Sequence, residues 1–383
     1  MAYITEPTHQ MVIKMNNKSR ILTELWKNSP ISRSNLAKLT GLNKATITNL
    51  VKELDEEGYI AEVGRQSSRV GRASDLIMFN DEIGMCCGVA ISTYNIRVIL
   101  CDAYARTLWR SDWAFERSGQ PQTIMERIAS EIKKGIDEID GSKKRKLRGI
   151  GIGLPSLVER ESGVMYGTPN IVNWSNIPVK DFFARRFQVP VFLDTISNNA
   201  VIGEKWFGAA QNDDNVIYLS IGQGIGAGIL TNGRLYSGAG GYAGDISHMV
   251  IDPSGPVCPC GKRGCWEVMG TTYTLMPQTI DELTEKADMR DIHAIEVLGS
   301  IGRSIGIGVA NLVRVLNPSL VLIGGSMARA GKWIMNPCVN QMKTELWTYV
   351  FDGMNVRFSE LGDDSGVIGS ATRVIEAMLV FQA

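Results

Sequence analysis

Four residues in one short segment have the types and the spacing of a metal site. His248 is followed, after nine residues, by Cys258 and Cys260, and Cys265 comes five residues later. Three thiolates and one imidazole satisfy the tetrahedral preference of zinc, and four protein ligands leave no position for a catalytic water. Chance clustering is the alternative, but the glycine and proline residues between the ligands supply the turns that would fold them around one ion. We therefore expect one structural Zn²⁺ per chain, bound by His248, Cys258, Cys260 and Cys265.

Polar side chains on both sides of this segment are candidates for binding a small molecule. Asp245 lies three residues before His248, and Glu267 lies two residues after Cys265. If His248 binds zinc through one ring nitrogen, its other nitrogen can meet a hydroxyl group of a ligand. The two acids could equally support the metal loop or face solvent. The glycine-rich segment 222–228 (GQGIGAG) resembles a turn that cradles phosphate, and a tight β-hairpin explains the same glycines equally well.

The N-terminal part of the chain is predicted to form a separate helical module. Apolar residues from Asn17 onward recur at helical spacing up to Trp26. Ser32 is suited to cap a second helix that Gly41 ends, and Asn43 is suited to cap a third. Two short helices joined by a glycine-containing turn indicate a helix-turn-helix. The residues of the third helix that are predicted to contact DNA are Asn43, Lys44, Ala45, Thr46, Thr48, Asn49 and Lys52.

A β-hairpin with a basic tip is predicted after the third helix. Residues 59–63 and 76–79 are expected to form its strands, and 64–72 to form its flexible tip. The basic residues of the tip that are predicted to contact DNA are Arg65, Arg69 and Arg72. Such arginines have a use at phosphates or in the minor groove, whereas a packing module gains nothing from them. A plain helical bundle is the alternative, but the hairpin and the 11 basic against 8 acidic side chains of residues 1–80 favour a winged helix-turn-helix that binds operator DNA.

Composition places the chain among globular proteins. The 383 residues are 44% apolar and 21% charged, with 40 basic and 40 acidic side chains, and no segment has the bias of a disordered tail. No uninterrupted apolar stretch approaches the roughly 18 residues of a membrane span, and the N-terminus lacks the pattern of a signal peptide. We expect a cytoplasmic protein without a membrane partner, in which the remaining cysteines are small buried apolar residues. These are Cys86, Cys87, Cys101 and Cys338.

Two similar passages predict a duplicated α/β unit in the larger C-terminal part. Each of them, from Gly88 and from Asn215, is a pair of apolar strands around a turn of small residues. Helices are expected at 121–139 and 281–316, and a final amphipathic stretch at 366–379 is expected to cross back to the first lobe. The expected division is a DNA-binding domain at 1–80 and a two-lobed domain at 81–383, with lobe one at about 81–198 plus about 366–383 and lobe two at about 199–365.

Six motifs in this larger part resemble the ROK family of bacterial repressors and sugar kinases. They are GIGIGLPSLV (149–158), TPNIVNW (168–174), GQGIGAGI (222–229), GDISH (244–248), CPCGKRGCWE (258–267) and NPSLVLIGG (317–325). With a winged helix in front, the match covers nearly the whole chain and most resembles the xylose-repressor branch. The resemblance implies a two-lobed hexokinase/actin-like fold. It also implies that Asn170, His248 and Glu267 hold sugar hydroxyls, with Asp245 in place of a longer Glu.

Three departures from the family's kinases concern phosphoryl transfer. The segment that carries the general base in those kinases has Ile196 in place of the Asp, and a hydrocarbon cannot accept a proton. The first phosphate turn aligns with residues 90–94 (AISTY), which lack its acid, glycine and threonine, and Gln223 replaces a threonine in the second. Thr195 and Ile196 also replace an amide and a carboxylate that hold one edge of the sugar. That edge should reject a ligand that places a hydroxyl group against Ile196.

Together these observations predict a sugar-responsive transcriptional repressor whose kinase-like domain has no catalytic residues. The effector would act by binding the arrangement that is incompetent for DNA more tightly. The operator should be read by a homodimer or a homotetramer, since paired recognition helices must lie one helical turn of DNA apart or a multiple of it. Two other functions stay open at this stage, namely an ATP-dependent sugar kinase and a constitutive repressor with a vestigial pocket.

Overall fold

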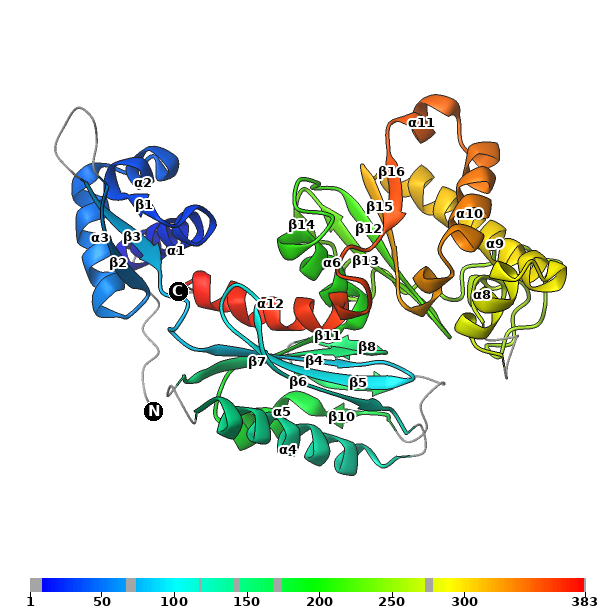
Figure 1. Ribbon diagram of the computed structural model, residues 1–383, viewed down its shortest axis with the longest axis horizontal. Helices are drawn as coiled ribbons and strands as arrows, with labels where there is room; N and C mark the ends of the chain where they lie inside the picture. Colours follow the sequence, from blue (N-terminus) through cyan, green and yellow to red (C-terminus); the bar gives the residue numbers. More distant parts are fainter. Residues whose placement is uncertain are drawn as a thin grey trace.

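The computed structural model describes residues 9–66, 74–116, 119–140, 145–160, 162–167, 174–272 and 278–381 (Figure 1). Its N-terminal module consists of three helices and a small antiparallel sheet with the strand order β1-β3-β2. The elements are α1 (His9–Asn28), β1 (Ile31–Ser32), α2 (Arg33–Thr40), α3 (Lys44–Glu56), β2 (Ile60–Gln66) and β3 (Ser74–Phe79). This arrangement is the predicted winged helix-turn-helix.

The helix caps of this module are those that the sequence predicts. The Ser32 hydroxyl accepts a hydrogen bond from the backbone N–H of Asn35 at the start of α2, and the Asn43 side chain accepts one from Thr46 at the start of α3. Gly41 ends α2 in the left-handed conformation. The apolar face of α3 is buried in the module's core. Its members are Ile47, Leu50, Val51 and Leu54.

Two predicted boundaries in this module are wrong. The first helix begins at His9 rather than near Asn17. Its first two turns are largely exposed, so their sequence lacks the apolar periodicity that indicates a packed helix. Arg65 lies in strand β2, in register with Asp75 of β3, rather than in the tip of the hairpin. Arg69 and Arg72 lie outside the described residues.

Two five-stranded sheets with the same topology form the larger part of the molecule. The strand orders are β11-β7-β4-β5-β6 and β16-β15-β12-β13-β14. In each sheet, three antiparallel strands are continued by two parallel ones, which confirms the predicted duplication. The strands are β4 (Met85–Ile91), β5 (Asn95–Cys101), β6 (Thr107–Ala114), β7 (Leu147–Leu154), β11 (Val191–Thr195), β12 (Val216–Ile221), β13 (Ile225–Thr231), β14 (Arg234–Leu235), β15 (Leu320–Gly324) and β16 (Asn355–Phe358). A separate small sheet contains β8 (Leu157–Glu159), β9 (Val164–Gly167) and β10 (Ile177–Pro178).

Helices cover both faces of the first sheet (Figure 1). Successive side chains of β4 point to opposite faces of the sheet. Cys86 and Ala90 pack in the hydrophobic core that includes α12 (Ser365–Leu379), whereas Cys87 and Val89 pack in the one that includes α4 (Pro121–Asp140). The C-terminal helix thus returns to the first sheet, as the sequence predicts. The helices of this part are α4 (Pro121–Asp140), α5 (Val179–Phe187), α6 (Ile196–Phe207), α7 (Trp266–Gly270), α8 (Ile280–Asp288), α9 (Ile292–Leu316), α10 (Lys332–Glu345), α11 (Thr348–Asp352) and α12 (Ser365–Leu379), with 3₁₀ turns η2 (Ser326–Ala330) and η3 (Gly362–Asp364).

The segment predicted as one helix over 281–316 is two helices. Arg290 adopts a positive φ of +66°, and Asp291 then caps α9 by accepting a hydrogen bond from the N–H of Ala294. Within the described residues α9 alone is long and apolar enough to cross a membrane. However, 56% of its 18-residue apolar stretch is buried inside the fold. It is a core helix of the second lobe.

Candidate metal centre and ligand cleft

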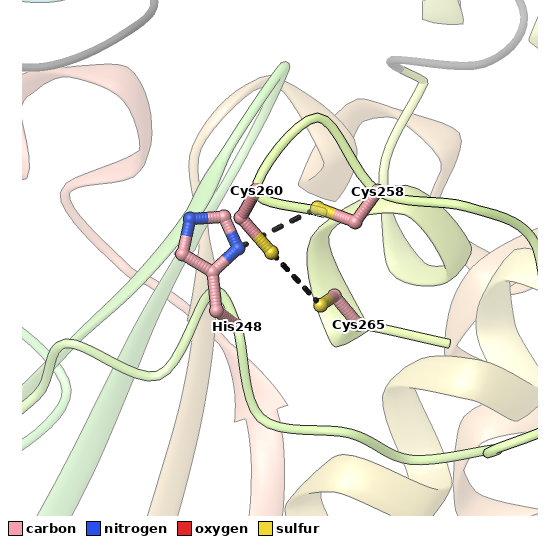
Figure 2. A group of neighbouring side chains, drawn as sticks. All are labelled: His248, Cys258, Cys260 and Cys265. Carbon is pink, nitrogen blue, oxygen red and sulfur yellow. Dashed lines mark hydrogen bonds between the residues drawn. The ribbon is translucent and has the colours of Figure 1, made fainter. Parts of the chain in front are cut away.

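The four predicted metal ligands lie together at the start of α7 and in the loop before it. The ligand atoms of His248, Cys258, Cys260 and Cys265 all lie within 4.8 Å of one another. The Sγ of Cys258 is 3.6 Å from Nδ1 of His248, and the two other sulfur atoms are 3.6 Å apart (Figure 2). Three sulfur atoms and one imidazole nitrogen at this spacing form a donor set that fits one tetrahedral ion.

The loop reaches this geometry through a tight backbone turn. Gly264 has φ of +65°, and a Cβ built on it would lie 1.5 Å from the carbonyl oxygen of Asp252. Any other residue there would displace the strand-like pairing between Val250 and Cys265. Gly264 is therefore required for the approach of Cys265 to the other ligands.

A cavity of about 450 Å³ opens beside the metal cluster. Five of the six residues predicted to bind a ligand line it, and they come from the junction of β11 and α6, from the loop before α7 and from α7 itself. They are Thr195, Ile196, Asp245, His248 and Glu267. The sixth, Asn170, lies outside the described residues. Ser156 and Ser247 also line the cavity, although they were not predicted from the sequence. The position of Ser247 beside His248 was the one available signal.

The metal cluster and the cavity share His248. Its Nδ1 faces Cys258, and its other ring nitrogen points away from the three sulfur atoms (Figure 2). A bound metal would fix this ring orientation, which leaves Nε2 available to a ligand hydroxyl. Glu267 is 8% exposed, and its burial raises the pKa of the carboxyl, which His248 partly offsets. Its backbone N–H donates to the carbonyl of Ser247, which ties α7 to the histidine segment.

The glycine-rich segment forms the turn of the β12–β13 hairpin and the first half of β13. A Cβ on Gly228 would lie 2.2 Å from the carbonyl oxygen of Ser197 in α6, and one on Gly224 would lie 3.1 Å from Oε2 of Glu267. These glycines therefore let the hairpin pack against α6 and against an acidic residue of the cleft. The hairpin alternative accounts for the segment without a phosphate.

The segment that aligns with the first phosphate turn of the family's kinases forms a turn in which a serine hydroxyl binds two backbone N–H groups. The hydroxyl oxygen of Ser92 accepts hydrogen bonds from the N–H groups of Tyr94 and Asn95, at 3.3 and 2.9 Å. Two amides that a phosphate would need are therefore already engaged. Tyr94 also lines the cavity at this end.

The other wall of the cavity is the junction of β11 and α6. Thr195 caps α6 by accepting a hydrogen bond from the N–H of Asn198, and Ile196 begins the helix. Asp194, 2% exposed, is held by the guanidinium of Arg160, with Nε 3.0 Å from Oδ2. It also accepts hydrogen bonds from Asn198 Nδ2 and Thr195 N. The acid that is present at this junction is thus paired, and the position after Thr195 is a hydrocarbon.

The predicted DNA-contacting residues of the third helix lie at the outer face of α3. Lys44, Ala45, Thr48, Asn49 and Lys52 are exposed, as is the capping residue Asn43, whereas Thr46 is half-buried. The Lys52 ammonium lies 3.8 Å from the carboxylate of Glu56, and both side chains are solvated. An exposed face of short polar groups and lysines is compatible with entry into a DNA groove.

Fold and site together define a class of protein, in which a winged helix-turn-helix precedes a two-lobed sugar-kinase-like domain with a thiol-rich cluster beside its cleft. A family model described as "ROK family" matches residues 86–377, and one described as "Winged helix-turn-helix DNA-binding" matches residues 16–61. The chain belongs to the ROK family, as its motifs suggest.

Known relatives include both regulators and kinases. A xylose repressor of Bacillus subtilis (strain 168) is 32% identical over 97% of this chain and 97% of its own. A glucokinase of Thermotoga maritima is 30% identical over 67% of this chain and 86% of its own. The crystal structure of a ROK family transcriptional regulator, described as a homologue of the E. coli MLC protein, superimposes with a TM-score of 0.83 at 24% identity, and covers 96% of this chain and 97% of that one. The glucokinase thus matches 67% of this chain, whereas the repressor and the regulator structure match 97% and 96% of it.

Proposed function

We propose that this protein is a DNA-binding transcriptional repressor whose kinase-like domain binds a sugar and does not phosphorylate it. The observation that carries the proposal is the combination of a winged helix with a cleft lined by Ile196 at the start of α6, where the motif resemblance places the general base of the kinases. The division into a DNA-binding domain at 1–80 and a sugar-binding domain at 81–383 is part of the proposal. Regulators that match the full length support it.

The exposed face of α3 is the proposed groove-reading surface, and the hairpin of β2 and β3 is the proposed wing. A homodimer or a homotetramer would bring two such helices to a two-fold related operator. Lys44→Ala and Lys52→Ala should each reduce the salt dependence of operator binding by about one unit of slope, because each lysine releases about one counterion. Lys343→Ala on α10, in the second lobe, is a matched control. An unchanged slope in both α3 variants would remove these lysines from the interface.

Zn²⁺ is the ion that we propose for the thiol cluster, with one ion per chain and a structural role. Four protein donors fill its coordination sphere, so it would supply charge and rigidity rather than a reactive water. It would hold His248 toward the cavity, and also Glu267, whose backbone N–H donates to the carbonyl of Ser247 beside His248.

The proposed ligand is a pyranose with a hydrogen-bonding edge and an apolar edge. Asp245, His248 and Glu267 offer acceptors and a ring nitrogen to its hydroxyls, and Ile196 faces the edge that would carry the hydroxyl phosphorylated by a kinase. A pentopyranose has hydrogen where a hexopyranose has a hydroxymethyl group, and so leaves no hydroxyl unpaired against Ile196. The name of the Bacillus relative makes D-xylose the first sugar to test.

Two observations support the absence of catalysis. The base position is a hydrocarbon, and the first phosphate turn uses its own serine hydroxyl to satisfy two amides. Phosphoryl transfer depends on positioning and on charge stabilisation, and neither is provided at that end of the cavity.

A panel of sugars distinguishes this proposal from its alternatives. We expect D-xylose to raise the melting temperature and D-glucose to raise it less, with no ADP formed from Mg²⁺-ATP in either case. ADP formation that depends on sugar would identify a kinase. No stabilisation by any pentose, hexose or sugar phosphate would identify a constitutive repressor with a vestigial pocket.

A further inference from the structure

One helix runs from the ligand cavity to the DNA-binding module. At its first turn, Thr195, Ile196 and Ser197 line the cavity. At its last turn, Trp206 and Phe207 pack on the core cluster that contains the winged helix. The twelve residues of α6 form a rod of about 18 Å, and its two ends therefore lie in the two functional regions.

Helix α12 is locked to α6 by close backbone contact. A Cβ on Gly369 would lie 1.7 Å from the carbonyl oxygen of Asn199, and one on Gly203 would lie 2.7 Å from that of Ser365. The Asn199 amide also donates to the hydroxyl of Ser370, at 2.9 Å. Helices packed at this distance cannot slide without a clash, so α6 and α12 move as one body.

An aromatic cluster joins this body to the first helix of the DNA-binding module. The ring of Trp26 lies 5.0 Å from that of Trp206, 5.8 Å from that of Phe207 and 5.3 Å from that of Tyr104. Its indole N–H donates to the carbonyl of Ala103, at 2.7 Å. One tryptophan of α1 therefore contacts α6 and the β5–β6 turn at the same time.

The contact continues to the proposed recognition helix. Lys18 of α1, 7% exposed, is paired with Glu53 and Glu57 of the α3 segment, at 3.0 and 2.6 Å. Beyond the end of α12, the N–H of Phe381 donates to the hydroxyl of Ser19, at 2.8 Å. Figure 1 shows α12 extending from the module to the region of α6. A shift of the α6–α12 body would therefore reach α1 at two contacts, Trp26 and Ser19. Helix α1 is in turn ion-paired with α3.

We propose that α6 and α12 form a lever that couples occupancy of the cavity to the position of the DNA-binding module, with Trp206 and Phe207 as its contact on Trp26. This proposal rests on the proposed function. The first turn of α6 is already packed on the β12–β13 hairpin of the second lobe. A sugar that touches both Ile196 and the Asp245–His248 segment therefore acts on the lever at the point where it joins that lobe. Its differential affinity for two positions of the lever is the energy available to change operator affinity.

The test removes the contact without touching either binding site. Trp206→Leu loses the edge-on contact with Trp26 and the indole hydrogen bond to Glu376, at 3.1 Å. Trp333→Leu is the matched control, because Trp333 is also half-buried and donates to a carboxylate, that of Asp288, at 2.9 Å in the second lobe. Phe207→Leu is a second, milder lever variant in case Trp206→Leu does not fold, which a thermal melt reports.

Operator affinity is measured by fluorescence anisotropy with and without saturating D-xylose, on a duplex that the full-length protein selects from a random library. Calorimetry reports sugar binding separately. We expect D-xylose to change the operator affinity of wild type and of Trp333→Leu by about tenfold or more, and that of the lever variants by less than about threefold, with sugar affinity retained.

Lever variants that respond as strongly as wild type overturn the coupling and leave the proposed function intact. A wild type that binds the selected duplex but responds to no sugar overturns the proposed function and the coupling with it.

Discussion

The two ends of the cleft have the same topological origin and opposite chemistry. At the metal end, the β12–β13 hairpin packs against α6, and His248 and Glu267 converge beside a cluster of three thiols. At the other end, the corresponding β4–β5 hairpin has a serine-closed turn and Tyr94 in the cavity wall. The two duplicated hairpins therefore differ. One borders the candidate ligand-binding residues, and the other ends in a turn whose N–H groups are already hydrogen-bonded.

The difference indicates which functions this cleft can keep. Holding a sugar requires acceptors and donors that are fixed before the ligand arrives, and the metal end supplies them. Transferring phosphate requires in addition a base and free backbone amides at the opposite end. A cleft that retains the first set without the second is suited to sensing a sugar.

The largest effect is expected from a variant that breaks the metal end. Cys260→Ser should lose the bound ion and lower the melting temperature by more than about 5 °C, because binding of a structural metal contributes directly to folding. Cys260 is itself exposed, so that loss of the thiol alone costs little. Metal analysis and calorimetric melting check both effects. Cys338→Ala, a buried thiol outside the cluster, should keep its metal. A wild type with less than about a tenth of an equivalent of zinc after purification without chelator would contradict the assignment.

A smaller effect is expected from a new carboxylate between the two ends. Ile196→Asp should not create a kinase, because the turn at Ser92 and Tyr94 still offers no cradle for a γ-phosphate. It should instead favour sugars with a hydroxyl group at that edge by about tenfold, since a buried carboxylate pairs with that hydroxyl. Thermal-shift profiles over a sugar panel and ATP turnover are the measurements, with Ile196→Val as the control. Phosphorylation by the single variant would show that the nucleotide end is intact.

The smallest effect is expected at the turn of the β12–β13 hairpin. Gln223→Thr restores a residue of the family's kinases, and the Gln223 Oε1 atom has no hydrogen-bond partner in the described residues. We expect sugar affinity within about threefold of wild type, because Gln223 is not among the residues proposed to hold the sugar, and no ATP turnover, because the turn at Ser92 is unchanged. Calorimetric titration with D-xylose provides the affinity. A loss of more than about tenfold would place the ligand nearer to this turn than proposed.

Local signals explain why much of this architecture follows from sequence. The caps Ser32 and Asn43 and the apolar strand pairs that begin near Gly88 and Asn215 depend on neighbouring residues only, and they occur where predicted. The clustering of the four candidate metal ligands was also predictable, because they lie in one segment of the chain. The break at Arg290 was not, since a non-glycine residue with a positive φ leaves no mark in an apolar pattern.

Contacts between distant segments were beyond the sequence. In the sequence, Trp26 is one more apolar residue of its helix. Its stacking on Tyr104 depends on how the DNA-binding module packs against the first lobe. The ion pair of Arg160 and Asp194 joins residues that no spacing relates. The close packing of α6 and α12 likewise needs the full chain to be folded.

The central claim is that a sugar controls operator binding without being consumed. The direct measurement is operator affinity during a titration with D-xylose, with and without Mg²⁺-ATP, while ADP is quantified in the same samples. We predict a saturable change in operator affinity of about tenfold or more that is the same with ATP, and no ADP above the background of the protein alone. An operator affinity that changes only in the presence of ATP, together with ADP that grows with the amount of sugar, would contradict the account.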